Sequence, residues 1–231
     1  MAKRQQTKGV CQLCQGVVGK AGMTQHLAKC LAAHEGEGAA VSKSPPKMVH
    51  LFQLLVQGQY DTEYWLYVEM PATATLRDLD QFLRDIWLEC CDHLSAFEIA
   101  GTQYSVETVE QAGDPRFESP REERSMDVPV GKVLRPEMKF THEYDFGSTT
   151  QLALRVVGER EGTNSQQRVR LLARNEPPQI LCELCKKKPA VWVEVYEDSA
   201  WCCEECIENT EEGVLPVVNS PRVGVCGYSG E

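Results

Sequence analysis

The sequence has no long apolar run and none of the common enzyme signatures. Within its 231 residues, no stretch approaches the roughly 20 apolar residues that span a membrane. The basic start of the chain is not followed by an apolar segment, which argues against a signal peptide, and we expect a cytoplasmic protein. The P-loop, the dinucleotide-binding glycine pattern, Gly-x-Ser-x-Gly and His-Glu-x-x-His are all absent. Their absence argues against the enzyme classes that these motifs define.

Beyond the first 47 residues, acidic residues clearly outnumber lysine and arginine. Residues 1–47 hold seven Lys or Arg against two acidic residues, residues 48–181 hold thirteen against twenty-two, and residues 182–231 hold four against ten. The overall net charge of −10 therefore conceals a basic amino-terminal segment. Only this segment is expected to attract a phosphate backbone. Its candidate nucleic-acid contacts are Lys3, Arg4, Lys8, Lys20 and Lys29.

Cysteine, by contrast, is abundant, and its spacing indicates metal binding. A reduced cytosol keeps thiols free of disulfides, so paired residues among the eleven cysteines are better explained as metal ligands. Near the amino terminus, a C-x₂-C pair precedes a His and a Cys that are four residues apart and share one face of a helix. Thr24 is a candidate cap for that helix, and His34 is an alternative helix ligand. The pattern predicts a zinc finger with the ligands Cys11, Cys14, His26 and Cys30.

A second cysteine pattern, near the carboxyl terminus, also predicts a zinc site. Two C-x₂-C pairs are separated by seventeen residues, which leaves room for a hairpin formed by residues 190–196 and 200–202. The acidic residues at 204, 205 and 208 favour a short helix after the hairpin, as in a treble-clef or ribbon module. Cys202 is an alternative to Cys203, but we expect it to point into the small core. The predicted ligands are Cys182, Cys185, Cys203 and Cys206.

Each predicted site has four protein ligands. A catalytic zinc usually keeps one coordination position open for water or substrate, whereas these sites are closed. We therefore predict two structural zinc ions per chain and no small-molecule cofactor. Of the remaining cysteines, Cys90 and Cys91 are expected to pack against apolar surface, and Cys226, in a glycine-rich tail, is expected to be unpaired.

The sequence between the two zinc motifs predicts an α+β domain. Strands are expected at residues 49–56, 63–69, 96–99, 102–105, 139–144 and 151–157, and residues 107–124 are expected to form a surface loop. Thr75 is a candidate cap for an amphipathic helix over residues 76–87. Residues 168–174 fit either a strand or a short helix. The predicted order is a finger (1–34), a flexible linker (35–47), the α+β domain (48–178), the second zinc module (179–212) and a tail (213–231); we expect the finger to be mobile.

Several motifs of this domain resemble a known family. The helix from Thr75, the segment His93-Leu-Ser-Ala-Phe-Glu-Ile99 and the string Phe140-Thr-His-Glu-Tyr-Asp-Phe-Gly147 are similar to the Ri-plasmid ORF-three-like family, over residues of about 48–160. That family includes TnpR-like passenger proteins of insertion elements. The resemblance implies a mixed sheet with a packed helix and brings no established activity or ligand. Family members commonly continue Tyr-Asp-Phe-Gly with Asp, Trp and His, which residues 148–152 lack.

A possible acid–base cluster lies near this string, formed by His93, His142, Tyr144 and Asp145. His142 alternates with Tyr144 along a strand, and Asp145-Phe-Gly147 is typical of a turn or bulge. We therefore favour a structural role for these residues and predict no catalytic residue.

The sequence leads to three functional hypotheses. We favour a non-enzymatic, zinc-binding interaction protein, associated with nucleic acid or with a mobile element, whose basic finger contacts the partner. The first alternative is a protein–protein adaptor without nucleic-acid contact, since residues 48–231 are strongly acidic and suit a basic partner. The second is an enzyme of mobile-element DNA processing, although a fold does not fix a function.

Overall fold

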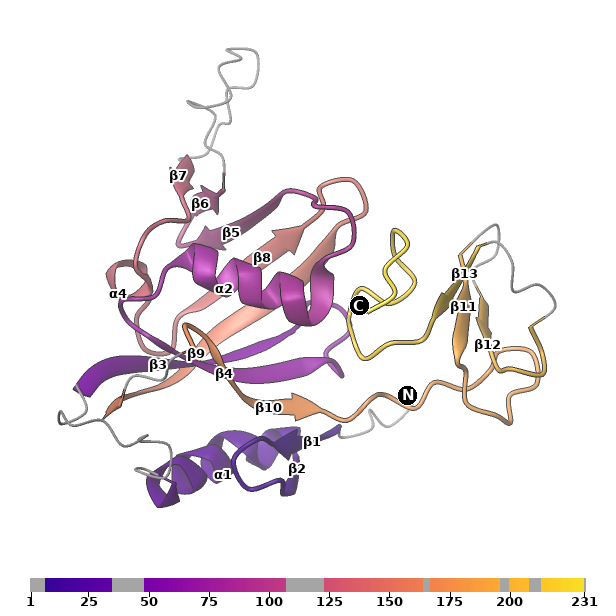
Figure 1. The fold of residues 1–231 in the computed structure, drawn as a ribbon, viewed down its shortest axis with the longest axis horizontal. Coiled ribbons are helices and arrows are strands. Elements are labelled where there is room, and N and C mark those ends of the chain that lie inside the picture. The colour runs from indigo at the N-terminus through magenta and orange to yellow at the C-terminus, as the bar shows by residue number, and fades with distance from the viewer. Residues whose placement is uncertain are drawn as a thin grey trace, which may run out of the picture.

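The computed structural model describes residues 7–34, 48–106, 123–163, 167–195, 200–207 and 213–230. The predicted linker, most of the predicted surface loop, and the candidate contacts Lys3 and Arg4 lie outside these ranges. Within them the chain is α+β, with a ten-stranded sheet, a three-stranded sheet and few helices (Figure 1). The predicted fold class is confirmed. No helix in these ranges is long and apolar enough to cross a membrane.

The large sheet has the strand order β2-β1-β10-β4-β3-β9-β8-β5-β6-β7. Its neighbouring strands are antiparallel, except for the parallel pair β6 and β7 at one edge, so the sheet is mixed. The strand bounds are β1 Lys8–Cys11, β2 Val17–Gly19, β3 Met48–Gly58, β4 Trp65–Pro71, β5 Ser95–Ile99, β6 Thr102–Ser105, β7 Glu123–Ser125, β8 Lys139–Tyr144, β9 Thr150–Thr163 and β10 Arg170–Asn175. The predicted strands are present, and β10 resolves the ambiguous segment as a strand.

One face of the sheet is covered by a helix that changes type along its length. Helix α2, Leu76–Leu83, begins with a capping box in which Thr75 and Asp78 exchange hydrogen bonds, as the sequence predicted for Thr75. It continues as the π-helix η1, Arg84–Leu88, which turns the fully buried Trp87 into the core. Both lie over the central strands of the sheet (Figure 1), and their apolar side chains share one buried cluster with those of the strands. A further short helix, α4, spans Val130–Val133.

The opposite face carries the amino-terminal finger, which is built into the sheet. Strand β1 pairs with β10 and with β2. Helix α1, Lys20–Ala33, lies on the face of the sheet away from α2 (Figure 1). Met23 and Leu27 of this helix share a buried cluster with Trp65 and Tyr67 of β4. Strand β4 is consequently buried along its whole length. The expectation of a mobile finger is wrong, because sheet pairing and a shared core hold it in place.

The carboxyl-terminal region forms a second, smaller sheet and then returns to the large one. The small sheet has the order β12-β11-β13, with β11 Trp192–Glu194, β12 Ala200–Cys202 and β13 Val214–Pro216. The part of the predicted helix that is described, residues 204–206, forms a turn. Beyond β13, Asn219 accepts a hydrogen bond from the Trp87 indole, and Ser220 donates one to the Trp87 carbonyl. The tail is therefore part of the main core.

Candidate metal centres

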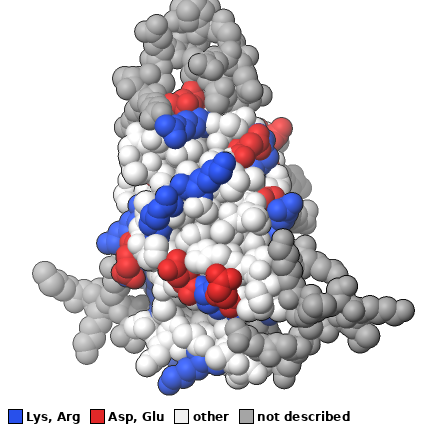
Figure 2. Space-filling view, turned by 90° about the vertical axis from the view of Figure 1, so that its left-hand side faces the viewer, with Lys and Arg blue, Asp and Glu red and all other residues white. Residues whose placement is uncertain are grey.

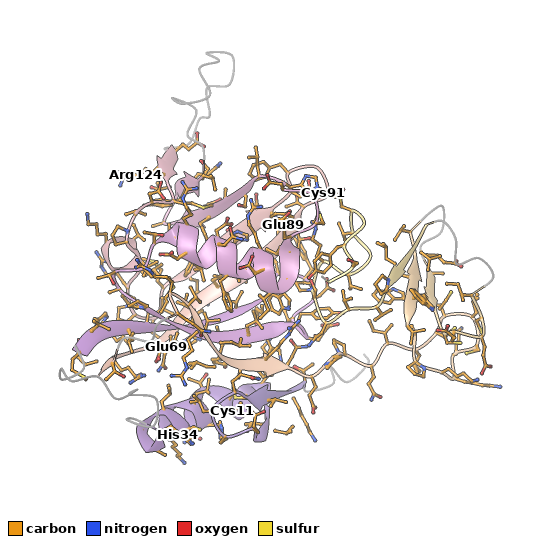
Figure 3. All side chains as sticks on the ribbon, in the orientation of Figure 1. Cys11, His34, Glu69, Glu89, Cys91 and Arg124 are labelled. Carbon is orange, nitrogen blue, oxygen red and sulfur yellow. The ribbon has the colours of Figure 1, made fainter. Side chains whose placement is uncertain are left out.

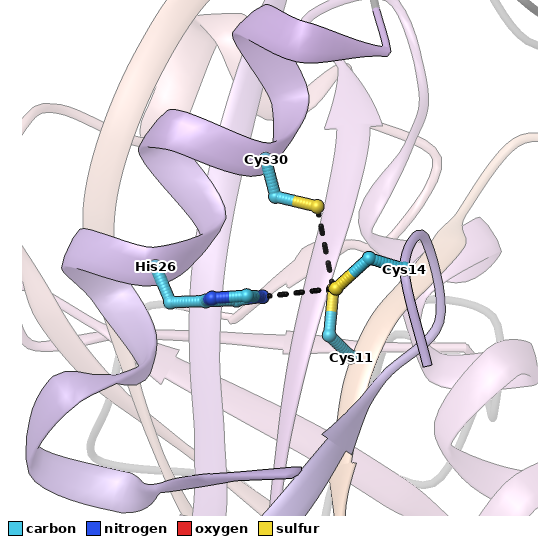
Figure 4. A group of neighbouring side chains, drawn as sticks. All are labelled: Cys11, Cys14, His26 and Cys30. Carbon is cyan, nitrogen blue, oxygen red and sulfur yellow. Dashed lines mark hydrogen bonds between the residues drawn. The ribbon is translucent and has the colours of Figure 1, made fainter. Parts of the chain in front are cut away.

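The four predicted ligands of the finger converge on one point. Cys11 ends β1, Cys14 lies in the turn before β2, and His26 and Cys30 lie one turn apart on α1 (Figure 4). Their ligand atoms all lie within 4.8 Å of one another. The Cys11 and Cys30 sulfurs are 3.8 Å apart, and the Cys14 sulfur is 3.4 Å from Nε2 of His26. Tetrahedral zinc, with bonds of about 2.0–2.3 Å, requires ligand separations of this size.

The structure favours His26 over His34 as the histidine of this group. His34 follows the last turn of α1, and its Nδ1 lies 2.8 Å from the Cys30 carbonyl oxygen and 3.7 Å from the Cys30 sulfur. The ring is thus engaged at the end of the helix (Figure 3), outside the group of four. Thr24 is not the helix cap, because α1 begins at Lys20 after Gly19. Its hydroxyl instead lies 2.9 Å from that of Tyr67, joining the finger to the sheet.

The carboxyl-terminal cysteines form a second group of four. Their sulfur atoms also lie within 4.8 Å of one another, with Cys185 and Cys203 3.9 Å apart. Backbone N–H groups, chiefly that of Cys185, lower the pKa of Cys182 to about 6, although burial acts to raise it. A lowered thiol pKa favours the thiolate, which is the form that binds metal. Cys202 lies outside the group and is fully buried within β12, where the sequence placed it.

Of the five candidate nucleic-acid contacts, the structure describes Lys8, Lys20 and Lys29. Lys8 and Lys29 are exposed, whereas Lys20 donates to the side chain of Gln57 and to the carbonyl of Thr62, at 2.7 and 2.6 Å. On the face that Figure 2 shows, basic and acidic side chains are interspersed. A hollow of about 580 Å³ on the sheet face opposite α2 has mixed charge as well, because Lys139, Arg155 and Glu98 are among its lining residues.

The possible acid–base cluster is divided between two environments. His142 is fully buried, and its Nε2 lies 2.7 Å from Asp80, which also pairs with the buried Arg84 at 2.9 Å. Burial acts to raise the pKa of Asp80, but the hydrogen bond and charge of His142, with smaller contributions from Ser95 and Arg84, hold it below its usual value. His142, Asp80 and Arg84 are all at least nine-tenths buried, which favours a structural role for this network.

Tyr144 and Asp145, from the string that resembles the family, bind the carboxyl-terminal tail. Two guanidinium groups lie over the Tyr144 ring, that of Arg84 at 4.9 Å and that of Arg222 at 4.8 Å from its centroid. Asp145 pairs with Arg222 at 2.8 Å and accepts hydrogen bonds from the N–H groups of Gly147 and Ser148. The hydrogen bond from Arg222, opposed by burial and supported by the two N–H groups, lowers the pKa of Asp145 to about 2. These contacts join Tyr144 and Asp145 to the carboxyl-terminal tail.

Sequence reasoning missed Arg222 and a third group of possible ligands. The fully buried Arg222 lies in a tail whose residue pattern gave no sign of a core role. Cys90, Cys91, His93 and Cys226 also place their ligand atoms within 4.8 Å of one another. Cys90 and Cys91 were expected to pack against apolar surface, and Cys226 was expected to be unpaired. Cys226 lies far from the other three in sequence, so no ligand spacing was recognisable.

Comparison with known proteins shows which family the sequence matches. The family model described as plasmid pRiA4b ORF-3-like protein matches residues 51–181. Among the solved structures that match is a protein of unknown function from Methanosarcina mazei Go1, with 18% identity and a TM-score of 0.41, covering 52% of this chain. The match spans 65% of that protein's own chain. No curated protein matches the chain.

Proposed function

The chain belongs to the plasmid pRiA4b ORF-3-like family, and on that premise we propose a non-enzymatic interaction protein stabilised by two terminal zinc ions. The observation that carries this proposal is the composition of the two terminal groups. Each offers four protein ligands of the kinds that structural zinc prefers, at separations that suit a tetrahedral ion. With four protein ligands, no coordination position is left for a substrate. Zinc there would serve the fold and the surfaces that the fold presents.

Native mass spectrometry of the full chain tests the two ions. We expect the wild type to lose zinc on chelation, and Cys14→Ser and Cys185→Ser each to lower the zinc content by one ion. Both cysteines are at least partly exposed, so their substitution removes a ligand without opening a core. Cys202→Ser, outside either group, is the control and should retain the wild-type content. A zinc content unchanged by Cys14→Ser and Cys185→Ser contradicts the proposal.

The partner surface that we propose is the exposed side of the finger. Residues 7–34 contain three lysines and no acidic residue, and Lys8 and Lys29 are exposed there. Docking on the sheet holds this surface rigid, which lowers the entropy cost of binding. Two or three phosphate contacts would give weak, strongly salt-dependent binding to nucleic acid.

A salt series with a fluorescent DNA or RNA duplex tests this surface. We expect Lys29→Glu and Lys8→Glu to weaken binding and, on DNA, to reduce the slope of log K against log salt by about 0.9 for each phosphate that the variant no longer neutralises. Lys139→Glu makes the same charge change at an exposed residue of the hollow on the sheet face opposite α2 and should leave the slope unchanged. Equal effects of all three variants would indicate a general charge effect and reject the finger as the binding surface.

The engagement of Lys20 favours a second candidate, the protein–protein adaptor. With its ammonium group bound to the side chain of Gln57 and the carbonyl of Thr62, Lys20 is less available to contact a phosphate than its sequence position suggests. A pull-down from nuclease-treated lysate, with wild type and Lys29→Glu as baits, distinguishes the two. Partner capture that survives nuclease and disappears with the variant supports the adaptor; loss of capture with nuclease supports nucleic acid.

The enzyme alternative has the least support. Its best candidate residues, His142 and Asp80, are buried within the core. A nuclease assay with plasmid DNA tests it, and cleavage that persists through repurification of the wild type but is abolished in His142→Ala would restore this hypothesis.

A further inference from the structure

A third group of metal-ligand side chains lies where the carboxyl-terminal tail meets the end of helix η1. Cys90 and Cys91 follow the helix, His93 lies in the loop before β5, and Cys226 comes from the tail. Figure 3 labels Cys91 at this end of the helix, beside the tail. The four ligand atoms lie within 4.8 Å of one another, and Nε2 of His93 is 3.2 Å from the Cys226 sulfur. We propose that these residues form a third zinc site, which fastens the tail to the main domain.

The donor set fits zinc. Three thiolates and one imidazole form one of the usual ligand sets of structural zinc. Soft thiolate ligands also select zinc over magnesium or calcium, which prefer oxygen. The group is partly open to solvent, with Cys91 and Cys226 exposed, so an ion can reach it in the folded protein.

The backbone on both sides of the group is arranged to bring the four residues together. Helix η1 ends at Leu88, and Glu89, which follows it, has an extended conformation. Asp92, between Cys91 and His93, has a φ of 56°, and Cys226 itself has a φ of 50°. Non-glycine residues in the left-handed region cost free energy and concentrate at ligand-binding segments. Asp92 lies beside the group of four, and Cys226 belongs to it.

A second set of residues orients the proposed ligands. Arg222 directs one N–H group at the Cys90 sulfur, at 3.4 Å, and another at Asp145, at 2.8 Å. Asp145 also lies 3.6 Å from Nε2 of His93, the same nitrogen that faces the Cys226 sulfur, so it places negative charge beside the proposed ion. Hydrogen bonds from outer groups, such as that from Arg222 to Cys90, fix the orientation of metal ligands. The buried Arg222 and Asp145 thus hold the tail and the loop in register before any ion binds.

The proposal adds one ion to the two terminal ones and is measured separately from them. Native mass spectrometry of the full chain, purified without oxygen and with zinc, should give three zinc ions for the wild type. Cys226→Ser and Cys91→Ser, both at exposed positions, should each give two, while Cys202→Ser should give three. With cobalt in place of zinc, each of the first two variants should show less thiolate-to-cobalt absorbance, because the site no longer holds the ion.

The outcomes separate this site from the proposed function. Two ions in the wild type, both retained in Cys226→Ser, overturn the third site and leave the terminal sites intact. Three ions in the wild type and in both variants overturn the ligand assignment. A disulfide between two of these cysteines in the oxygen-free protein, seen as the loss of two hydrogens in mass, also overturns it. If Cys226→Ser does not fold, Cys91→Ser provides the same test, because it leaves the tail sequence intact.

Discussion

The two terminal Cys-rich groups are similar in ligand number but differ in their relation to the main core. The finger contributes strand β1 to the large sheet and shares a buried cluster with Trp65 and Tyr67. The carboxyl-terminal group supports a separate sheet of three strands, and neither main core cluster includes a described residue of that sheet. Similar groups of ligands therefore lie in two settings: the finger is joined to the main core, and the carboxyl-terminal group lies beside a small sheet of its own. Stability should depend on the two regions unequally.

The largest expected effect comes from the packing between finger and sheet. Trp65 is fully buried between them, so Trp65→Ala should lower the free energy of unfolding by about 4 kcal/mol. Urea unfolding followed by circular dichroism measures this change. The matched variant Val193→Ala, at a buried residue of the small sheet, should leave the main transition unchanged. Equal shifts of the main transition in both variants would mean that the small sheet is part of the same cooperative unit.

A pH-dependent effect is expected in the core under α2. The folded pKa of Asp80 lies below its usual value, so its stabilisation is present above about pH 4 and is lost as pH falls through the folded pKa. Asp80→Asn should cost about 2 kcal/mol at pH 7, because it weakens bonds to His142 and Arg84.

Urea unfolding of wild type and Asp80→Asn at several pH values provides the measurement. The difference between them should shrink as the pH falls below about 4. Asp85→Asn, at an exposed residue of η1, is the control and should not show this behaviour. A difference that is constant from neutral to acidic pH would contradict the assigned role of Asp80.

A smaller effect is expected at the polar contact between finger and sheet. Thr24→Val removes the hydrogen bond to Tyr67 with little change of shape and should cost about 1 kcal/mol. Gln25→Ala, at an exposed neighbour on the same helix, should be close to neutral. Thermal unfolding of the three proteins compares them, and a neutral Thr24→Val would show that apolar packing alone fixes the finger.

The smallest effect is expected on the surface of the second module. Lys188 forms an ion pair with Glu205 at an exposed position, so Lys188→Ala should change the free energy of unfolding by less than about 0.5 kcal/mol. Hydrogen exchange of residues in β11 should likewise be unchanged. Faster exchange there would mean that this pair contributes to the fold of the small sheet.

Local patterns predicted the elements of this fold, but not the contacts between distant segments. Alternation and capping identified the strands of the large sheet and helix α2, and spacing identified both terminal groups of four. The docking of the finger depends on Trp65 and Tyr67, whose burial on the second face of β4 is a tertiary property. The role of Arg222 and the third ligand group likewise require the return of the tail. Sequence spacing cannot reveal contacts that are made only in the folded chain.

The position of strand β10 has a consequence for the synthesis of the protein. Strand β1, at the start of the chain, has β2 and β10 as its partners, and β10 joins it to β4. A nascent chain therefore carries its finger without a sheet to join until residue 175 has left the ribosome. We expect Trp65 and Tyr67, which share a buried cluster with α1, to be less well covered during that interval. Chaperone demand should peak during that interval, because the finger is made well before the strand β10 that pairs with it.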